Sequence, residues 1–152
     1  MPEADDILSE AERKALATAS VGAPRVAPLK VLIVEDDKGS RHALASYFKA
    51  HGIRCLVAEN TSVAFDYLKR KPEIGLLITD LRMQPVGGIE FIKQIRESDK
   101  AALPIIIVSG DAEVQDAIEA MHLSVVDFLL KPLDGEQLAK LVVLVKRELG
   151  IG

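Results

Sequence analysis

The run Val31-Leu32-Ile33-Val34-Glu35-Asp36-Asp37 decides the fold of this chain. Four apolar residues, three of them β-branched, are followed at once by three carboxylates. A short continuous apolar run with a polar end is typical of a strand buried on both faces of a parallel sheet. Similar runs follow at residues 55–58, 76–79, 105–108 and 128–130. The sequence therefore predicts five such strands.

Helical periodicity fills the stretches after these runs, at residues 40–50, 62–69, 89–97, 114–121 and 135–149. In the last stretch the apolar residues recur at helical spacing, namely Leu138, Leu141, Val142, Val145 and Leu149. A strand followed by a helix, repeated along the chain with short crossovers, predicts an α/β fold with a five-stranded parallel, doubly wound sheet.

Residues 1–29 differ from the rest and are predicted to form an N-terminal extension to a single domain at residues 30–152. Its first half carries a thin apolar stripe at helical spacing: Ile7, Leu8, Ala11, Ala15 and Leu16. Residues 21–28 contain Gly and Pro and are predicted to be a linker. Two interpretations of the extension stay open, a frayed tail and a short docking or dimerising helix.

Composition narrows the class of protein. The 152 residues are 49% hydrophobic but only 4% aromatic, which predicts an aliphatic core under helices. The net charge of −4 gives no basis for a nucleic-acid or anionic-membrane surface. No apolar run approaches the roughly 20 residues of a membrane span, and the first residues lack a secretory pattern. We expect a cytoplasmic protein with no membrane or nucleic-acid partner.

Ligands of an open parallel sheet bind outside the carboxyl ends of its strands. The residues that follow the predicted strands are therefore the candidates for chemistry. Glu35 and Asp36 follow the first, Asp80 the third, Ser109 the fourth and Lys131 the fifth. Carboxylates packed together repel one another, and a hard divalent cation such as Mg²⁺ removes that repulsion. Such a metal beside an ammonium and a hydroxyl predicts a phosphoryl site, with Asp80 as the nucleophile.

At this point the sequence clearly resembles the receiver domain of two-component response regulators. The resemblance runs from about residue 30 to residue 150 and is carried by four segments: Val31-Leu32-Ile33-Val34-Glu35-Asp36-Asp37, Thr79-Asp80-Leu81-Arg82-Met83, Pro104-Ile105-Ile106-Ile107-Val108-Ser109-Gly110 and Asp127-Phe128-Leu129-Leu130-Lys131-Pro132. Asp36, Asp80, Ser109 and Lys131 follow one another at intervals of 44, 29 and 22 residues, which also fit the family. The resemblance implies a flavodoxin-like (βα)5 receiver fold.

The resemblance further implies roles for the acidic residues. Asp80 is the expected phosphoacceptor. Asp36 is expected to touch the metal directly and Glu35 mainly through a bound water, and the backbone carbonyl of Arg82 completes the protein ligands. The implied cofactor is Mg²⁺, with Mn²⁺ as a substitute. The chain would be a phosphoacceptor that assists its own phosphorylation and dephosphorylation, and not an enzyme in the ordinary sense.

Three further roles are implied at the other strand ends. Ser109 matches the conformational-switch hydroxyl, and Lys131 matches the phosphate-binding lysine before an expected cis bond to Pro132. Phe128 stands where the family has a rotating aromatic, although a core aromatic is an equally good interpretation. Phosphorylation would then change the surface of the fourth helix, fifth strand and fifth helix. A homodimer through that face is one expected consequence.

The implied partners are a histidine kinase or a histidine phosphotransfer protein as donor, in a two-component system or phosphorelay, and a downstream protein that the sequence does not identify. Only residues 150–152 follow the last predicted helix, so output through protein contact is expected, unless the chain is cut from a longer protein.

Two departures from the family's pattern stand out. Gln84 holds the place of the usual Pro, with Pro85 next, so this loop is expected to trace a different path. Residues 122–125 contain no Gly where one often ends the fourth helix, so a strained or reshaped end is expected. From the spacing alone, we also hypothesise that Arg82 and Asp111 pair across the phosphoryl site and lengthen the phosphoryl lifetime. The alternative is two solvated loop charges.

Other classes of protein fit less well. A phosphatase with an Asp nucleophile usually has a second Asp two residues later, where this chain has Arg82. A dinucleotide-binding domain needs a Gly-rich turn after the first strand, and the carboxylates there would repel a pyrophosphate. A receiver-like partner-binding module without phosphorylation stays open. Cys55 is predicted to be a core residue, and the three histidines ordinary surface or boundary residues: His42, His51 and His122.

Overall fold

The computed structural model describes residues 29–151 and shows a three-layer α/β architecture. The five strands are β3 (Lys30–Val34), β4 (Cys55–Ala58), β5 (Ile74–Thr79), β6 (Ile105–Ser109) and β7 (Asp127–Leu130). The five helices are α1 (Lys38–Ala50), α2 (Thr61–Arg70), α3 (Gly88–Arg96), α4 (Val114–His122) and α5 (Gly135–Leu149). The predicted extension at residues 1–29 lies outside the described residues, apart from Leu29.

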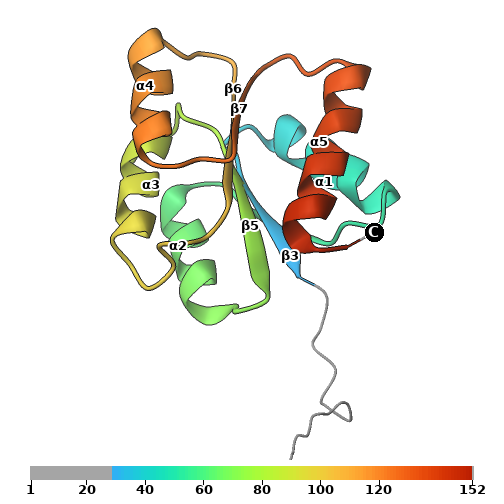
Figure 1. Cartoon of the computed structure of the whole chain (residues 1–152), viewed down its shortest axis with the longest axis horizontal. Helices are drawn as coiled ribbons and strands as arrows, with labels where there is room; N and C mark the ends of the chain where they lie inside the picture. The colour runs from blue at the N-terminus through green and yellow to red at the C-terminus, as the bar shows by residue number, and fades with distance from the viewer. Residues whose placement is uncertain (1–28, 152) are drawn as a thin grey trace, which may run out of the picture.

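All neighbouring strands are parallel, in the order β4-β3-β5-β6-β7. Helices α1 and α5 cover one face of the sheet, and α2, α3 and α4 cover the other (Figure 1). This confirms the predicted five-stranded, doubly wound α/β fold. The order reverses between β3 and β5, and this is where an open parallel sheet places its ligands.

Alternation along the strands divides the core into two halves. Leu32, with its neighbours, packs toward α2, α3 and α4, whereas Ile33 packs toward α1 and α5. Strands β3, β5 and β6 are buried on both faces, as their apolar runs predict. The same prediction was wrong for the edge strands. In β7 the ends are exposed, with Leu130 56% exposed, because an edge strand has only one neighbour.

Short polar residues set the beginnings of three helices. The side chain of Asp37 accepts a hydrogen bond from the Ser40 backbone at 2.7 Å, which caps α1. Asn60 caps α2 in the same way, and Asp134 forms a capping box at the start of α5. The end of α4 differs, since Ser124 takes a positive φ of 58° where a Gly is usual. This confirms the expected unusual end of that helix.

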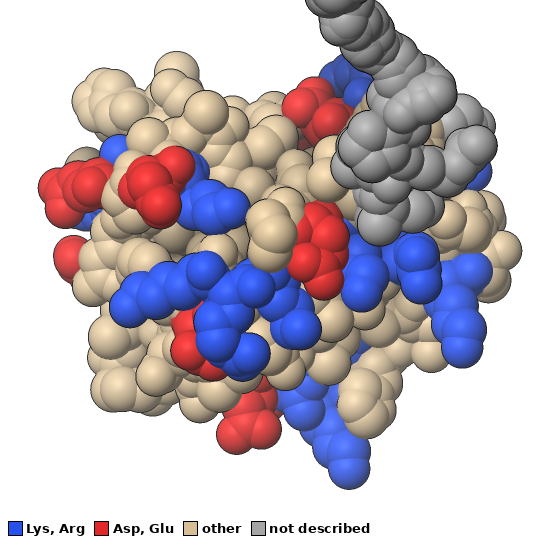
Figure 2. Space-filling model, turned by 90° about the horizontal axis from the view of Figure 1, so that it is seen from below, with Lys and Arg blue, Asp and Glu red and all other residues tan. Residues whose placement is uncertain are grey.

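Basic residues gather at the opposite ends of the helices. The last turns contain Lys49, Lys69, Arg70, Lys93, Arg96, Lys146 and Arg147. Figure 2 shows Lys and Arg spread across the lower face of the molecule, toward which the amino-terminal end of β3 points in Figure 1. Cations at helix carboxyl ends are stabilised by the helix dipoles. Because all strands run in the same direction, Glu35 and Asp80, which follow strand ends, lie at the opposite edge of the sheet. Among the described helices, none is long and apolar enough to cross a membrane.

Candidate functional site

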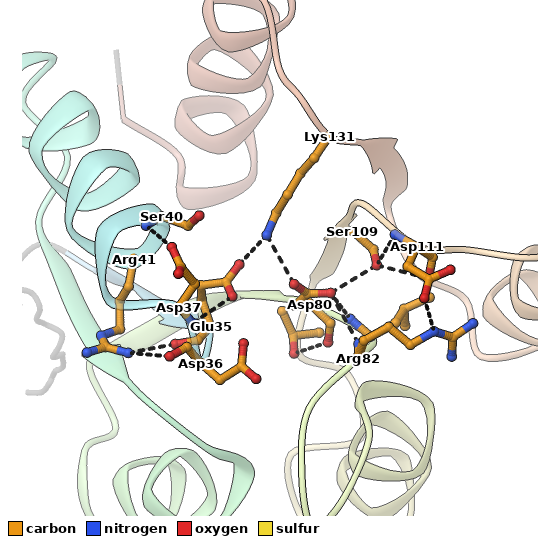
Figure 3. A network of polar contacts seen from close by, with 12 residues as sticks. Glu35, Asp36, Asp37, Ser40, Arg41, Asp80, Arg82, Ser109, Asp111 and Lys131 are labelled. Carbon is orange, nitrogen blue, oxygen red and sulfur yellow. Dashed lines mark hydrogen bonds and ion pairs between the residues drawn. The ribbon is translucent and has the colours of Figure 1, made fainter.

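Four side chains from four different segments meet at the carboxyl edge of the sheet (Figure 3). Glu35 directly follows β3, Asp80 follows β5, Ser109 ends β6 and Lys131 follows β7. The strand order and the parallel register bring these strand ends together. The structure thus places side by side four of the residues that the sequence singled out.

Asp80 is the centre of this group and is only 8% exposed. Its Oδ1 accepts hydrogen bonds from the Leu81 backbone N–H at 2.6 Å and the Arg82 backbone N–H at 3.2 Å. The Ser109 hydroxyl donates to the same oxygen at 2.9 Å. Its Oδ2 lies 3.0 Å from the Lys131 Nζ. The carboxylate is therefore fixed by donors on both oxygens.

Lys131 bridges two buried carboxylates. Its Nζ contacts both Asp80 Oδ2 and Glu35 Oε1. The other Glu35 oxygen accepts a hydrogen bond from the Asp37 backbone N–H at 3.0 Å. The cis bond between Lys131 and Pro132, which the resemblance predicted, is present. The ammonium supplies the positive charge that two adjacent buried carboxylates need.

The electrostatics of the three groups follow from burial and these contacts. Burial alone would raise the pKa of Asp80, but hydrogen bonds from Lys131, the Arg82 backbone and Ser109 outweigh it and lower that pKa. Burial opposes the charged form of Lys131 too, yet its two carboxylate partners raise its pKa. For Glu35 burial dominates, and the pKa is raised despite the bond from Lys131. Asp80 is thus a partly desolvated carboxylate whose contacts favour the ionised form.

The loop after Asp80 depends on Gly88. Its N–H donates to the Leu81 carbonyl at 2.9 Å, which closes the loop. A Cβ at this position would collide with the backbone carbonyl oxygen of Asp80 and lie 2.9 Å from the Leu81 Cα. The same loop contains the Gln84-Pro85 departure, where the peptide bond is cis.

The predicted metal ligands are only partly assembled. Glu35 and Asp80 converge, but Asp36 is exposed at the same edge, and within residues 29–151 no three His, Cys, Asp or Glu side chains are close enough to hold an ion together. In this arrangement Lys131 lies between two of the carboxylates, and the predicted metal ligands stay a prediction. The chemistry of the donor set still fits a hard cation, since Glu35, Asp36 and Asp80 offer carboxylate oxygens at one edge of the sheet (Figure 3).

The side chain of Arg82 turns away from Asp80. Its Nη2 lies 2.6 Å from Asp116 Oδ2 in α4, and its Nε lies 3.7 Å from Asp111 Oδ2. The predicted Arg82–Asp111 pair is therefore the longer of two contacts, and its effect on phosphoryl lifetime stays a prediction. Asp116 was missed by the sequence reasoning. The Glu113-x-x-Asp116 spacing of a capping box was the available indication that a carboxylate stands in the first turn of α4.

The remaining singled-out residues lie farther from this centre. Phe128 of β7 is half-buried and packs against the part of the core that lies between the sheet and helices α2, α3 and α4. Cys55 is half-buried in β4, and burial raises the pKa of its thiol to about 12. The histidines are exposed, as expected: His42, His51 and His122.

A largely apolar pocket of about 570 Å³ opens beside the site. Leu44 and Tyr47 of α1 form part of its wall, and Leu133 and Leu138 form another part. Asp80 and Lys131 also line it. The Asp80 carboxylate therefore borders a cavity between α1 and the beginning of α5.

Several known proteins are similar to this chain. The family model "Response regulator receiver domain" matches residues 31–143. A solved response regulator receiver protein from Pseudomonas putida is 49% identical, with a TM-score of 0.76 over 81% of this chain and 99% of that one. A two-component response regulator from Clostridium difficile is 25% identical, with a TM-score of 0.70 over 80% of this chain and 96% of that one.

Curated relatives are longer than this chain. The KDP operon transcriptional regulatory protein KdpE of Escherichia coli is 36% identical over 77% of this chain and 51% of its own length. The transcriptional regulatory protein FixJ of Azorhizobium caulinodans is 32% identical over 80% of this chain and 56% of its length. The chain spans a quarter to about half of the curated relatives that it matches. Because these relatives are named as transcriptional regulators, the expected lack of a nucleic-acid partner stays a prediction.

Proposed function

Because this chain belongs to the response regulator receiver domain family, we propose that it accepts a phosphoryl group on Asp80 and thereby switches a protein-binding surface. One observation carries the proposal. Asp80 is a buried, ionised carboxylate that points toward a pocket and is held between Lys131 and Ser109. A structural aspartate at a strand end needs none of these surroundings.

The transfer follows from the state of Asp80. An oxygen of the carboxylate forms a bond to phosphorus while the bond from phosphorus to the donor breaks, and the departing group takes up a proton from solvent. No base has to deprotonate Asp80, since its lowered pKa keeps it ionised near neutral pH. Lys131 neutralises charge on the phosphoryl oxygens, and Ser109 donates a hydrogen bond to one of them.

The residues that would hold Mg²⁺, or Mn²⁺ in its place, are the carboxylates of Glu35, Asp36 and Asp80 and the backbone carbonyl of Arg82. A bound divalent cation would supply positive charge to the phosphoryl oxygens as negative charge collects on them. Asp36 is already at the edge and exposed, so it can turn toward such an ion without disturbing the core.

The phosphodonor would be a histidine kinase or a histidine phosphotransfer protein in the cytoplasm. The pocket between α1 and the beginning of α5 offers it an apolar wall directly beside Asp80. Phosphate-bearing imidazole could enter there while the donor's apolar side chains cover Leu44 and Tyr47. The chain itself would act as a phosphoacceptor that assists its own phosphorylation and dephosphorylation.

The output would pass through α4, β7 and α5. Ser109 would follow the phosphoryl group and carry its loop, and Phe128, half-buried beneath, would turn inward. Several apolar side chains are already exposed on these elements: Val114, Ile118, Met121, Leu130 and Val143. Exposed apolar side chains are suited to contact with a protein partner, which here would be a downstream target or a second copy of the chain.

The test is incubation with acetyl phosphate and Mg²⁺ followed by intact-mass measurement. The wild type should gain one phosphoryl adduct, and Asp80→Ala should gain none. Chelation of the metal should abolish the adduct in the wild type. An adduct of equal yield in both proteins would place the acceptor on another residue and refute the proposal.

A further inference from the structure

Helix α4 is attached to the domain by polar contacts more than by a packed face. Ala120 is its only buried residue. Val114 is 78% exposed and Met121 76% exposed, so its apolar side chains face outward. A helix with so little buried apolar surface is held weakly by the hydrophobic effect. Its position must therefore depend on other contacts.

Three cations from neighbouring segments supply those contacts. Arg82 pairs with Asp116 in the first turn of α4 at 2.6 Å. Lys93 of α3 pairs with Glu119 at 3.4 Å. At the other end, Arg96 of α3 donates to the carbonyl of Leu123 at 2.8 Å. The three contacts form a polar seam from the beginning of α4 to its end.

Only the Arg82 contact joins this seam to the phosphoacceptor. The backbone N–H of Arg82 donates to Asp80 Oδ1 at 3.2 Å, and its guanidinium pairs with Asp111 and Asp116. Figure 3 shows Arg82 beside Asp80 with its side chain directed toward Asp111. Lys93 and Arg96 both belong to α3, beyond the acceptor loop. A change of charge at Asp80 would therefore act directly on the Arg82 end of the polar seam.

We propose that Arg82 is a latch on α4 that phosphorylation of Asp80 releases, because the phosphoryl group draws the guanidinium away from Asp116. This inference rests on the proposed function. A phosphoryl group adds roughly −1.5 to −2 charges and three acceptor oxygens. The planar guanidinium binds such oxygens in bidentate fashion, so the phosphoryl group outcompetes the single-oxygen contacts that Asp116 and Asp111 make with it.

Release of the latch disturbs the first turn of α4 in particular. The Asp116 side chain is only 13% exposed, and it also accepts a hydrogen bond from the Glu113 backbone at 2.8 Å. A carboxylate that loses its cation in a partly buried position is destabilised until it reaches water. The first turn then moves outward, while Arg96 keeps the other end of α4 in place. The exposed apolar side chains change position as one unit.

Hydrogen exchange measured by mass spectrometry on the acetyl phosphate-treated protein tests the latch, because the same spectra report the adduct. Peptides that cover residues 113–121 should exchange about two- to fivefold faster when Asp80 is phosphorylated. Asp116→Asn keeps an oxygen for the Glu113 N–H but removes the charge. This variant should exchange fast before phosphorylation and change no further after it.

Glu119→Gln is the matched control on the same helix. It breaks the Lys93 contact, which lies away from Asp80, so it should speed exchange in both states and preserve the phosphorylation-dependent difference. An adduct without faster exchange in the wild type would refute the latch alone. A full phosphorylation-dependent difference in Asp116→Asn would also refute it. The absence of any adduct on Asp80 would refute the proposed function, and the latch with it.

Discussion

Replacement of Lys131 by Met removes the ammonium that lies between Glu35 and Asp80. Met has a similar length and fills the same space, so the change isolates the charge. The two partly buried carboxylates then keep their hydrogen-bond donors but lose the cation between them. We expect a less stable protein at neutral pH.

The magnitude follows from the geometry. At 3.0 Å the attraction between Lys131 Nζ and Asp80 Oδ2 is about 5.5 kcal/mol for an effective dielectric constant near 20. The Lys131 side chain is 27% exposed, and solvent screening reduces this figure. Truncation of one partner of a buried pair usually costs about 3–5 kcal/mol. We therefore expect Lys131→Met to lower the free energy of unfolding by about 2–4 kcal/mol.

Urea unfolding followed by far-UV circular dichroism measures this loss, since the chain has no Trp. The pH dependence has a definite sign. In the wild type, Asp80 has a lowered pKa and contributes stability that is lost as the pH falls through it. In the variant both carboxyl groups lose the contact that lowers their pKa, so protonation relieves their repulsion. The gap between the two proteins should be widest near pH 7 and narrow below about pH 5.

Lys140→Met is the control, because that side chain is 76% exposed and pairs with Glu136 within one helix. Its effect should stay below about 0.5 kcal/mol. If Lys131→Met matched this control near pH 7, or if its deficit grew as the pH fell, the bridging role of the ammonium would be refuted.

Three further outcomes are expected. Gly88→Ala should lower the free energy of unfolding by about 1–3 kcal/mol, since the added Cβ collides with the Asp80 carbonyl. Gly135→Ala is the control and should change this free energy little, because open space surrounds that position. Equal effects of the two substitutions in urea unfolding would contradict this. Asp37→Ala should lower Tm by a constant amount above about pH 5 and by less below about pH 4, because the hydrogen bond from the Ser40 backbone lowers the pKa of Asp37. A Tm difference between wild type and variant that widens in acid would contradict this. If Arg82 hinders attacking water, Arg82→Ala should speed dephosphorylation, which is measured as the rate at which the adduct mass disappears. An unchanged or slower rate argues against that role.

The sequence was sufficient for most of the fold because the apolar runs are long and uniform. The strand that includes Val31–Val34 and the helix at Gly135–Leu149 lie within a residue of their predicted places. The error at β7 has a physical source. Phe128-Leu129-Leu130 is as apolar as a central strand, but burial depends on how many neighbours the topology provides, and β7 has one. The local sequence does not indicate how many neighbouring strands a strand will have.

The site was predictable only as far as strand ends determine it. Parallel pairing brings Asp80, Ser109 and Lys131 to one edge whatever their side chains do afterwards. The position of the Lys131 Nζ between two carboxylates depends on the rotamer of a long side chain, and no spacing rule supplies it. The Arg82–Asp116 pair joins residues 34 positions apart, and it depends on how α4 is set against the loop. Sequence patterns predict which strands and helices are neighbours. Which charged side chains pair depends on their rotamers and length, which the patterns do not give.

The distribution of charge at this edge explains why phosphorylation would have distant effects. Lys131 is already shared between Glu35 and Asp80, so its single charge offsets only part of the charge that a phosphoryl group would add. Added negative charge on Asp80 must then be met by a bound divalent cation, by Arg82, or by both. Arg82 is itself committed to Asp116. Because Lys131 and Arg82 are both already paired, new charge at Asp80 would disturb these pairs, and through Arg82 the imbalance would reach the Asp116 carboxylate of α4.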